Sequence, residues 1–561
     1  MFTERYTPLE VLSQFPTHEP TLWGMLESRA RVGPTRPLLL FQGRVCTYGE
    51  AAARAEMIAR SLYARGVAKG DRVAVMAANS EAHVLLLLAL ANLGAIAVPV
   101  NPELNATEAG YIFRHAEVAA VACTSASLPT AGAAADELPN PPWLLLLEGE
   151  SDSVVTFPDL LRSSAPHGRR SAGPDDTCLI LYTSGTTGFP KGVMHSQRNF
   201  VLAGEMFVER MYLQPDDRLF AVLPLFHMNA LFYSLGGALA AGASLLLAPR
   251  FSASAFWRVA ADGGATEVNI LAAVGNILTR RARGEFVAGH RLRKVYGAGM
   301  SDETLQLFPR EFGVPTLIEG YGMTEVPGVC NNPFLGPHKP GSMGCPARHP
   351  DHSRSFSEMR VLDDEGHEVP VGRTGEIAVR SPITMQGYYR DPEATAAAFR
   401  DGWFLTGDLG YRDADGYYYF VARKKDIIRR RGENVSGAEI DRVVAAHPKV
   451  LEAAAIAVPG ELGEDEILVV AVPRPGEVLA PDEIADWCAE HLAPYKRPRF
   501  LTQVGSLPYT PSHRVAKFKL KQDPTLRQRA VELRGRLEIG LRAPIPYRYD
   551  LGHERTEALS Q

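Results

Sequence analysis

Residues 182–192, with the sequence YTSGTTGFPKG, combine three glycines, four Ser and Thr hydroxyls and one lysine directly after the apolar run 178–181. Backbone N–H groups of a glycine-rich loop can surround an anion, hydroxyls donate to phosphate oxygens, and Lys191 adds a positive charge. The spacing differs from the GxxxxGK[ST] loop of the common ATPases. A polar surface turn is the alternative, but it does not explain a lysine at this offset. The pattern therefore predicts a phosphate-binding loop at the end of a buried strand.

Two segments farther along the chain carry residues that suit a nucleotide. Residues 321–325, YGMTE, bring together an aromatic face, a hydroxyl and a carboxylate, which suit adenine stacking, phosphate binding and Mg²⁺ binding. In residues 403–410, WFLTGDLG, we expect Asp408 to lie on a turn and accept hydrogen bonds from both ribose hydroxyls. Alone, Glu325 or Asp408 would more often be a turn residue or a helix cap.

Two further segments complete an ordered series. They are the basic stretch 423–435, RKKDIIRRRGENV, and residues 507–517, LPYTPSHRVAK. Five such segments in this order favour an adenylating enzyme. The competing hypothesis is a nucleotide-binding regulator without turnover, and the presence of Lys191, Glu325, Asp408 and Arg423 argues against it.

These motifs resemble those of the AMP-forming acyl-CoA synthetases, also called adenylate-forming or acyl-activating enzymes, from about residue 23 to residue 521. Lesser marks are residues 47–50, 66–73, 224–227 and 297–300, and residues 429–436 are similar to the carnitine and crotonobetaine CoA ligase branch. The resemblance implies a large N-terminal domain of layered α/β subdomains plus a small β-barrel, and a smaller mobile α+β C-terminal domain. The expected divisions are an AMP-binding domain 1–423, a mobile domain 424–521 and a tail 522–561.

The resemblance also implies roles for individual residues. Catalytic roles fall on Thr183, Lys191, His227, Glu325, Arg514 and Lys517, with Glu325 as the Mg²⁺ ligand, Lys425 as the hinge and Gly432 in the coenzyme A channel. Contacts with ATP or AMP fall on Thr183, Ser184, Gly185, Thr186, Thr187, Gly188, Lys191, Gly297, Ala298, Gly299, Tyr321, Gly322, Met323, Thr324, Asp408 and Arg423. The expected walls of the acid pocket are His227, Met228, Ala230, Phe232 and residues 271–275, 297–299 and 321–324.

One motif departs from the family pattern. Where the family has Thr-Gly-Lys, this chain has Ser512, His513 and Arg514. Arg514 keeps the positive charge but presents a planar guanidinium, and its charge is permanent. We expect Arg514 to replace the family lysine at the α-phosphate, while Lys517 corresponds to the second lysine of the motif.

The function expected from the resemblance is ATP-dependent activation of a small or medium carboxylic acid and its transfer to coenzyme A, with ATP, Mg²⁺ and coenzyme A as cofactors. An alternative keeps adenylation but changes the partner, as in relatives from secondary metabolism. The acceptor would then be a carrier-protein thiol or an amine, or the activated acid would be nitrite for the diazotisation of an aryl amine.

Composition agrees with a globular enzyme of two or more domains. The 561 residues exceed what one core supports, and the net charge of −5 does not favour nucleic acid as a partner. Six cysteines without a CxxC pair suit a reducing cytosol, and the first residues do not form a signal peptide, so we expect a cytoplasmic monomer or homodimer.

Apolar patterning predicts α/β layers with largely parallel sheets through residue 320. Residues 84–100 and 231–249 are each interrupted by glycine, so a membrane span is disfavoured and a buried helix followed by a strand is expected. Residues 116–135, rich in Ala, Ser and Thr, are expected to form a loop and a surface helix. The Arg-rich tail is expected to form an amphipathic surface helix.

Overall fold

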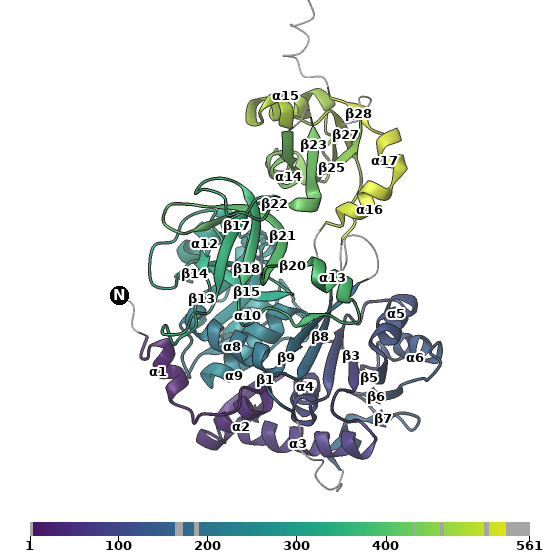
Figure 1. The fold of residues 1–561 in the computed structure, drawn as a ribbon, viewed down its shortest axis with the longest axis vertical. Helices are drawn as coiled ribbons and strands as arrows, with labels where there is room; N and C mark the ends of the chain where they lie inside the picture. Colours follow the sequence, from purple (N-terminus) through teal and green to yellow (C-terminus); the bar gives the residue numbers. More distant parts are fainter. Residues whose placement is uncertain are drawn as a thin grey trace, which may run out of the picture. The chain divides into compact units, whose positions relative to one another are not determined.

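The computed structural model describes residues 4–162, 172–183, 190–430, 433–460, 465–509 and 515–533. These residues belong to two compact units, 1–421 and 422–561 (Figure 1).

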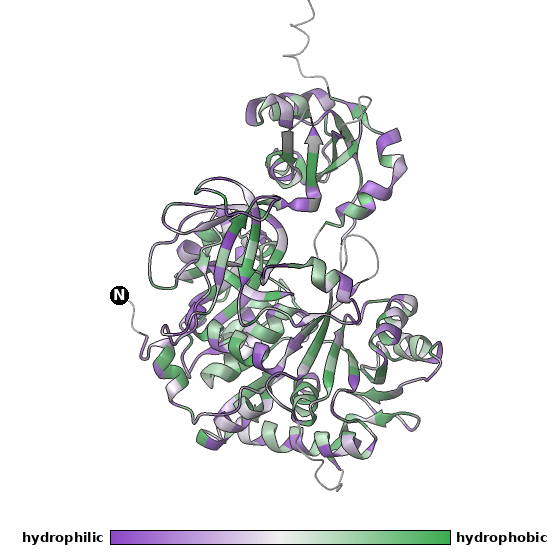
Figure 2. Ribbon diagram, viewed as in Figure 1, coloured by the Kyte–Doolittle hydropathy of each residue, from purple (hydrophilic) through white to green (hydrophobic). Residues whose placement is uncertain are grey.

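An eight-stranded sheet in the first unit carries the predicted phosphate-binding loop. Its central strands are buried on both faces, so successive residues alternate between two cores: Val73 and Val75 face one apolar cluster, and Ala74 and Met76 face another that α5 and α6 cover. This two-sided burial is typical of parallel strands between helical layers, and the strands are green in Figure 2. In sheet order the strands are β19 (Gly387–Tyr388), β9 (Lys191–Ser196), β8 (Thr177–Thr183), β4 (Ile96–Val100), β3 (Arg72–Met76), β5 (Val118–Cys123), β6 (Trp143–Leu146) and β7 (Val155–Thr156).

A nine-stranded sheet forms the second layer of this unit. Strands β10 to β14 run parallel, so residues that follow β12, β13 and β14 meet at one edge of the sheet. In sheet order the strands are β16 (Cys345–Pro346), β15 (Val326–Asn331), β14 (Thr316–Met323), β13 (Lys294–Ala298), β12 (Glu267–Leu271), β10 (Arg218–Ala221), β11 (Ser244–Leu247), β1 (Pro37–Phe41) and β2 (Arg44–Thr47).

A third, smaller sheet corresponds to the small β-barrel that the resemblance implies. It is antiparallel, and its middle strand β21 pairs with β18, β20 and β22. The strands are β17 (Glu358–Leu362), β18 (Gly375–Arg380), β21 (Trp403–Arg412), β20 (Phe399–Arg400) and β22 (Tyr418–Arg423).

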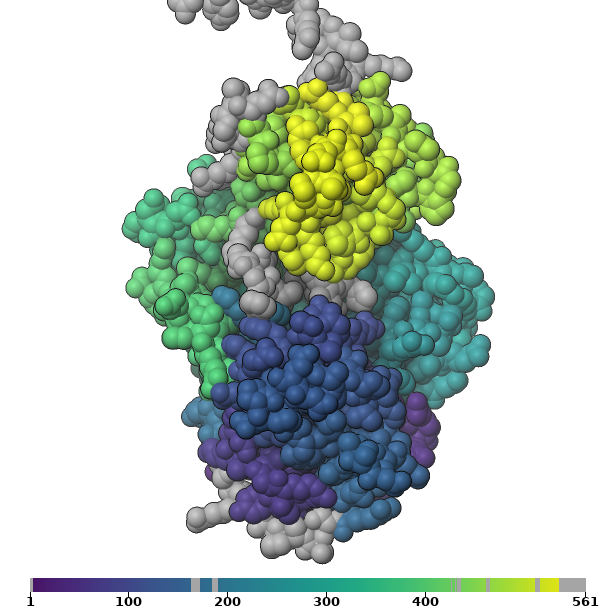
Figure 3. Space-filling view, turned by 90° about the vertical axis from the view of Figure 1, so that its right-hand side faces the viewer, coloured from purple at the N-terminus to yellow at the C-terminus, as the bar shows by residue number. Residues whose placement is uncertain are grey.

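The helices of the first unit cover these sheets, and α5 and α6 lie at the blue surface in Figure 3. Helix α4 begins at the cap Ser80, whose Oγ accepts from the His83 N–H at 3.1 Å, and ends at Gly94, whose φ is +72°. The helices are α1 (Pro8–Ser13), α2 (Leu22–Val32), α3 (Tyr48–Ala64), α4 (Glu81–Leu93), α5 (Ala106–Ala116), α6 (Leu128–Asp136), α7 (Phe157–Leu161), α8 (Gln197–Met211), the π-helix η1 (Asn229–Leu235), α9 (Gly236–Ala241), α10 (Phe256–Asp262), α11 (Ala272–Arg280), the 3₁₀ turn η2 (Arg283–Glu285), α12 (Asp302–Glu311) and α13 (Pro392–Ala397).

Both predicted helix-then-strand segments are confirmed, by α4 with β4 and by η1 and α9 with β11. The expectation for residues 116–135 is wrong in its first half, because residues 118–123 form the buried strand β5. Small side chains such as Ala120 and Ala122 are 0% exposed there, since a strand packed on both faces accepts alanine where helices approach closely. No helix in the described part of the chain is long and apolar enough to cross a membrane.

The second unit is a small α+β domain. Its four-stranded sheet is mixed, with β25 antiparallel and β27 parallel to β26. Its elements are the 3₁₀ turn η3 (Lys424–Asp426), β23 (Ile427–Arg430), β24 (Glu433–Ser436), α14 (Gly437–Ala445), β25 (Val450–Pro459), β26 (Asp465–Pro473), α15 (Pro481–His491), the 3₁₀ turn η4 (Pro494–Lys496), β27 (Phe500–Gln503), α16 (Lys517–Gln522), α17 (Pro524–Gln528) and β28 (Val531–Glu532). The expected tail helix lies outside the described residues.

All six cysteines are free thiols, and five of them are buried.

Candidate active site

The predicted phosphate-binding loop joins β8 and β9, which form an antiparallel hairpin. Thr183 and Lys191 are opposite each other in its register, so the two ends of the loop are held side by side. Gly192 cannot carry a side chain here, because a Cβ would lie 2.7 Å from Cγ2 of Ile180. Ser184, Gly185, Thr186, Thr187 and Gly188 lie outside the described residues, and their phosphate contacts remain predictions.

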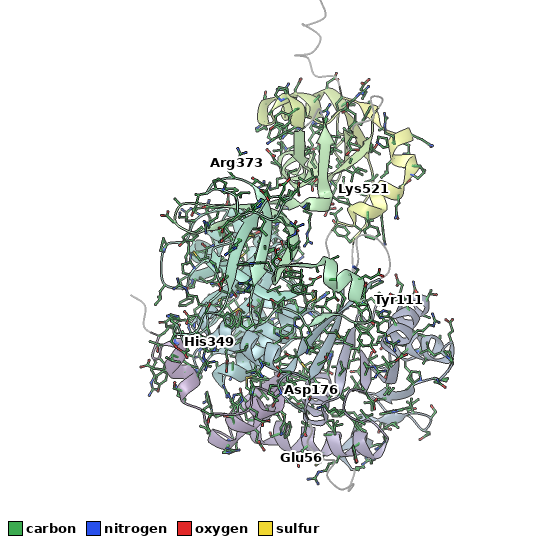
Figure 4. The ribbon with its side chains drawn as sticks, in the orientation of Figure 1. Glu56, Tyr111, Asp176, His349, Arg373 and Lys521 are labelled. Carbon is green, nitrogen blue, oxygen red and sulfur yellow. The ribbon has the colours of Figure 1, made fainter. Side chains whose placement is uncertain are left out.

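Helix α5 supports the end of the hairpin that carries the loop. The Tyr111 hydroxyl donates to the Pro190 carbonyl at 3.3 Å, and His115 Nδ1 lies 2.7 Å from the Tyr182 hydroxyl. Tyr111 is labelled in Figure 4. The rings of Tyr111 and His115 stack with centroids 5.6 Å apart. Burial raises the pKa of Tyr182, so its hydroxyl stays protonated and can serve as a hydrogen-bond partner at neutral pH. These aromatic contacts fix the chain at both ends of the loop.

Lys191 lies at the start of β9 beside the segment that follows β18. Its ammonium nitrogen is 3.9 Å from Oδ2 of Asp391 and 4.9 Å from the centre of the Tyr388 ring. The side chains of Lys191 and Asp391 are each 38% exposed, so this lysine can be reached from solvent. An exposed, loosely paired lysine at a loop end suits the binding of a phosphate.

Glu325 occupies the tight turn between β14 and β15. It is 9% exposed, and the Tyr388 hydroxyl donates to its Oε1 at 3.0 Å. His195, which is fully buried, fixes the turn by donating from Nε2 to the Thr324 carbonyl at 2.7 Å. Burial lowers the pKa of His195 to about 4, so the ring is neutral at physiological pH.

Glu325 fits a magnesium ion by the chemistry of its donor atoms, since Mg²⁺ prefers carboxylate oxygens. Among the described residues no group of three or more His, Cys, Asp and Glu side chains could hold a metal ion. One protein carboxylate together with substrate phosphates is a usual way to bind Mg²⁺. Glu325 is therefore the residue that would hold the ion, together with nucleotide phosphates.

Tyr321 and Asp408 meet at the nucleoside end of the site. The Tyr321 hydroxyl donates to Oδ2 of Asp408, which is fully buried. The expected turn at Asp408 is wrong: the residue lies inside β21, next to an irregular register and to Gly407 with φ +70°. The left-handed glycine turns the strand locally, so a strand can present a carboxylate where the sequence pattern suggests a turn.

Gly297, Ala298 and Gly299 end β13 and lead into Met300. Ala298 and Gly299 are exposed, and Gly299 has φ +64°, which favours glycine. A Cβ at Gly322 would lie 2.6 Å from the Gly328 nitrogen, so β14 and β15 also require glycine. The end of β13 thus exposes backbone and the small side chain of Ala298.

Glu319 is a half-buried carboxyl near this surface that motif reasoning missed. Its Oε1 accepts from the Met300 N–H at 3.1 Å. Burial raises the pKa of Glu319 to about 7. It precedes Tyr321 by two residues and shares its face of β14.

His227 lies on the loop between β10 and η1. Its backbone N–H donates to the Pro224 carbonyl at 3.0 Å, and its ring centroid is 4.5 Å from that of Phe226. Asn79, which is 3% exposed, holds the loop by accepting from the Leu225 N–H at 2.7 Å. Asn79 has no motif around it, so the sequence carries no signal for this role.

In the second unit, Lys517 is bound by a carboxylate. Its ammonium nitrogen lies 2.5 Å from Oδ2 of Asp441 on α14, and its side chain is 13% exposed. Arg514 and Gly432 lie outside the described residues. The backbone of Lys425 forms part of η3, directly after Arg423 ends β22, but its side chain is not described.

The structure therefore brings several predicted residues together within the first unit. Lys191 and Glu325 share contacts with Tyr388, and Tyr321 contacts Asp408. Tyr388 itself was missed, because it lies far along the chain from both residues and only the pairing of β19 with β9 brings it near.

Residues 26–389 match the family model described as AMP-binding enzyme, and residues 439–514 match the AMP-binding enzyme C-terminal domain. The chain belongs to the AMP-binding enzyme family.

Individual relatives cover nearly the whole chain. Sulfoacetate–CoA ligase of Cupriavidus necator is 35% identical over 509 residues, which are 89% of this chain and 97% of the relative. Crotonobetaine/carnitine–CoA ligase of Salmonella agona is 31% identical over 516 residues, with 89% and 98% covered. The solved structure of the anthranilate CoA ligase AuaEII in complex with anthranoyl-AMP superposes with a TM-score of 0.81 at 26% identity, covering 92% of this chain and 99% of that one.

These matches confirm the resemblance and the fold that the motifs predict. The chain is an AMP-forming acid–thiol ligase, which activates an acid as its acyl adenylate and transfers it to coenzyme A, with ATP and coenzyme A as cosubstrates. Its substrate is a small-molecule acid.

Proposed function

We propose that the first unit binds ATP for adenylation along a line that runs from Asp408 to Lys191. Tyr321 and Asp408 bind the adenosine end, and Glu325, four residues after Tyr321, binds the phosphate end. The single observation that supports this arrangement is the Tyr388 side chain, which contacts both Lys191 and Glu325.

Adenylation joins two anions, so it needs cations more than it needs a protein nucleophile. Lys191, with Thr183 and the loop 184–188, would hold the β- and γ-phosphates. A magnesium ion on Glu325 would neutralise phosphate charge when bound. Arg514 would bring the remaining positive charge to the substrate carboxylate and the α-phosphate. Lys517 would assist within the same C-terminal motif, residues 507–517, and His227 would assist at the acid pocket.

We propose Gly297, Ala298, Gly299, Gly322, Met323 and Thr324 as further nucleotide contacts, and Arg423 as a ribose contact. We also propose three divisions of the chain: a first domain 1–423, a mobile domain 424–521 and a tail 522–561. Lys425 would be the hinge between the first two, and Gly432 would be the place where pantetheine passes close to the backbone. Cytoplasmic location and a monomeric or homodimeric state remain proposals.

The acid pocket favours an uncharged acyl group. Its expected walls include no arginine or lysine, and the accessible ones, such as His227, Met228, Ala273 and Ala298, carry no permanent charge. Relatives named for sulfoacetate and oxalate activate acids with a second negative charge. Since a second charge would find no arginine or lysine among these walls, we propose a monocarboxylic acid with an aryl, short branched or medium-chain acyl group.

The test is a screen of the full chain with ATP, Mg²⁺ and a panel of acids, with and without coenzyme A. We expect release of AMP and pyrophosphate, and a thioester only when coenzyme A is present. The panel contains aryl, branched and dianionic acids and nitrite, and parallel reactions offer a carrier-protein thiol or an amine. Formation of ADP would contradict the proposal, and turnover of only dianionic acids would contradict the pocket assignment.

A further inference from the structure

The segment after β18 forms a third strand on the hairpin that carries the phosphate-binding loop. β19 pairs with β9, so that Tyr388 is opposite Val193. On either side, the Gln386 N–H donates to Met194 O at 2.9 Å and the Tyr389 N–H donates to Gly192 O at 2.7 Å. The position of Tyr388 relative to β9 is therefore fixed by the backbone.

Contacts beyond β19 hold the same segment in place. The Tyr388 N–H donates to Oγ1 of Thr395 at 2.9 Å, and Asp391 caps α13 by accepting from the Ala394 N–H at 2.9 Å. Arg390 adopts φ +55°, a left-handed conformation, and pairs with Glu117 at 2.6 Å. A non-glycine residue at positive φ persists only where its surroundings determine it. The backbone around Tyr388 is therefore held in one conformation.

The Tyr388 side chain uses this fixed backbone to reach two charged groups. Its ring faces the Lys191 ammonium with 4.9 Å between the nitrogen and the ring centre, and its hydroxyl donates to Glu325 Oε1 at 3.0 Å. The ring face attracts a cation, and the hydroxyl restricts the rotation of the carboxylate. The Asp391 carboxylate, whose Oδ2 is 3.9 Å from the Lys191 ammonium nitrogen, further restricts the position of that ammonium group.

We infer that Tyr388 is a positioning residue that orients Lys191 and Glu325 together for Mg²⁺ and nucleotide phosphates. This inference rests on the proposed roles of those two residues. It predicts that the Tyr388 hydroxyl acts on the Mg²⁺ requirement through Glu325, while the ring acts on nucleotide affinity through Lys191.

The test measures binding of α,β-methylene-ATP to the full chain by calorimetry at increasing Mg²⁺. Tyr388→Phe keeps the ring, so affinity without Mg²⁺ should match wild type, while the Mg²⁺ concentration for half-maximal binding should rise about threefold to tenfold. Tyr388→Leu should also weaken binding without Mg²⁺, by about twofold to fivefold. Tyr417→Phe is the matched control, since it removes a similar hydrogen bond, to Pro337 O at 2.6 Å, away from the site.

A double-mutant cycle with Glu325→Gln separates positioning from a merely structural effect. In the Glu325→Gln background, Tyr388→Phe should cause no further change in the Mg²⁺ requirement, and melting temperatures verify folding of each variant. Additive effects, or a Tyr388→Phe titration equal to that of Tyr417→Phe, would overturn the inference. A wild-type chain that does not bind the nucleotide would instead contradict the proposed function.

Discussion

Lys517 and Arg514 are the two cations of the C-terminal motif, and the contact between Lys517 and Asp441 bears on which of them serves at the α-phosphate. Asp441 on α14 is partly buried, which raises its pKa, and Lys517 opposes that rise, so the lysine is paired with a carboxylate of the second unit. A lysine held in this way is poorly placed to serve also as the cation at the α-phosphate. The contact favours Arg514 for that role.

We therefore expect Arg514→Ala to lower the rate of adenylation about a hundredfold, or on the order of 3 kcal/mol in transition-state stabilisation. Thioester formation from synthetic acyl-AMP should stay near the wild-type rate, and Arg514→Lys should keep or raise adenylation. Pyrophosphate exchange measures the first step and thioester yield the second. Wild-type adenylation by Arg514→Ala, together with its loss in Lys517→Ala, would transfer the role to Lys517.

His195 predicts how stability depends on pH. Its folded-state pKa of about 4 lies below the value of about 6.5 in an unfolded chain, so between these values the unfolded state binds a proton that the folded state does not. The stability that goes with the neutral ring is therefore fully present and independent of pH above about 6.5, and it is lost as pH falls from about 6.5 towards 4. His195→Gln, which can still donate to Thr324 O, should show a smaller fall in melting temperature between pH 7 and pH 5. An equal fall in both proteins would contradict the assignment.

At the scale of elements, β14 and β15 depend on the absence of a side chain at one position. A Cβ at Gly322 would lie 2.6 Å from the Gly328 nitrogen and 2.8 Å from the Tyr233 hydroxyl, and a backbone atom cannot move aside cheaply. We expect Gly322→Ala to destabilise the first unit by about 1–3 kcal/mol and to weaken nucleotide binding. Gly284→Ala, where a Cβ meets nothing within 4 Å, is the control in thermal unfolding. Equal melting temperatures for the two variants would show that the strands adjust.

Element order and type were predictable from the sequence wherever apolar runs were long, as for α4 followed by β4. The strand β5 was not, because its run of alanine, valine and cysteine gives no clear period, and Asp408 was not, because the bend inside β21 comes from Gly407 in a left-handed conformation. In the site, motifs identified Lys191 and Glu325. They could not identify Tyr388, since pairing between distant strands leaves no local pattern.

At the scale of the whole molecule, two units divide the chain near the basic stretch that the motifs mark as a hinge. Lys425 lies in η3, a single 3₁₀ turn between two strands, and such short turns can absorb changes in φ and ψ. Proline at this position would fix φ and remove a donor. We expect Lys425→Pro to impair one half-reaction more than the other, measured as pyrophosphate exchange against thioester yield. Equal losses in both would count against a hinge at this residue.

The burial of the cysteines has a practical consequence for following this reaction. Burial raises the pKa of Cys46 and Cys123 to about 11 and of Cys330 and Cys488 to about 12, and it also raises those of Cys178 and Cys345. A disulfide reagent reacts with thiolates, which a free thiol with a pKa near 8.5 provides and which these thiols, with their raised pKa values, provide to a smaller extent. Such a reagent should therefore count unreacted coenzyme A in the presence of the folded enzyme, and the appearance of six additional reactive groups should mark its unfolding.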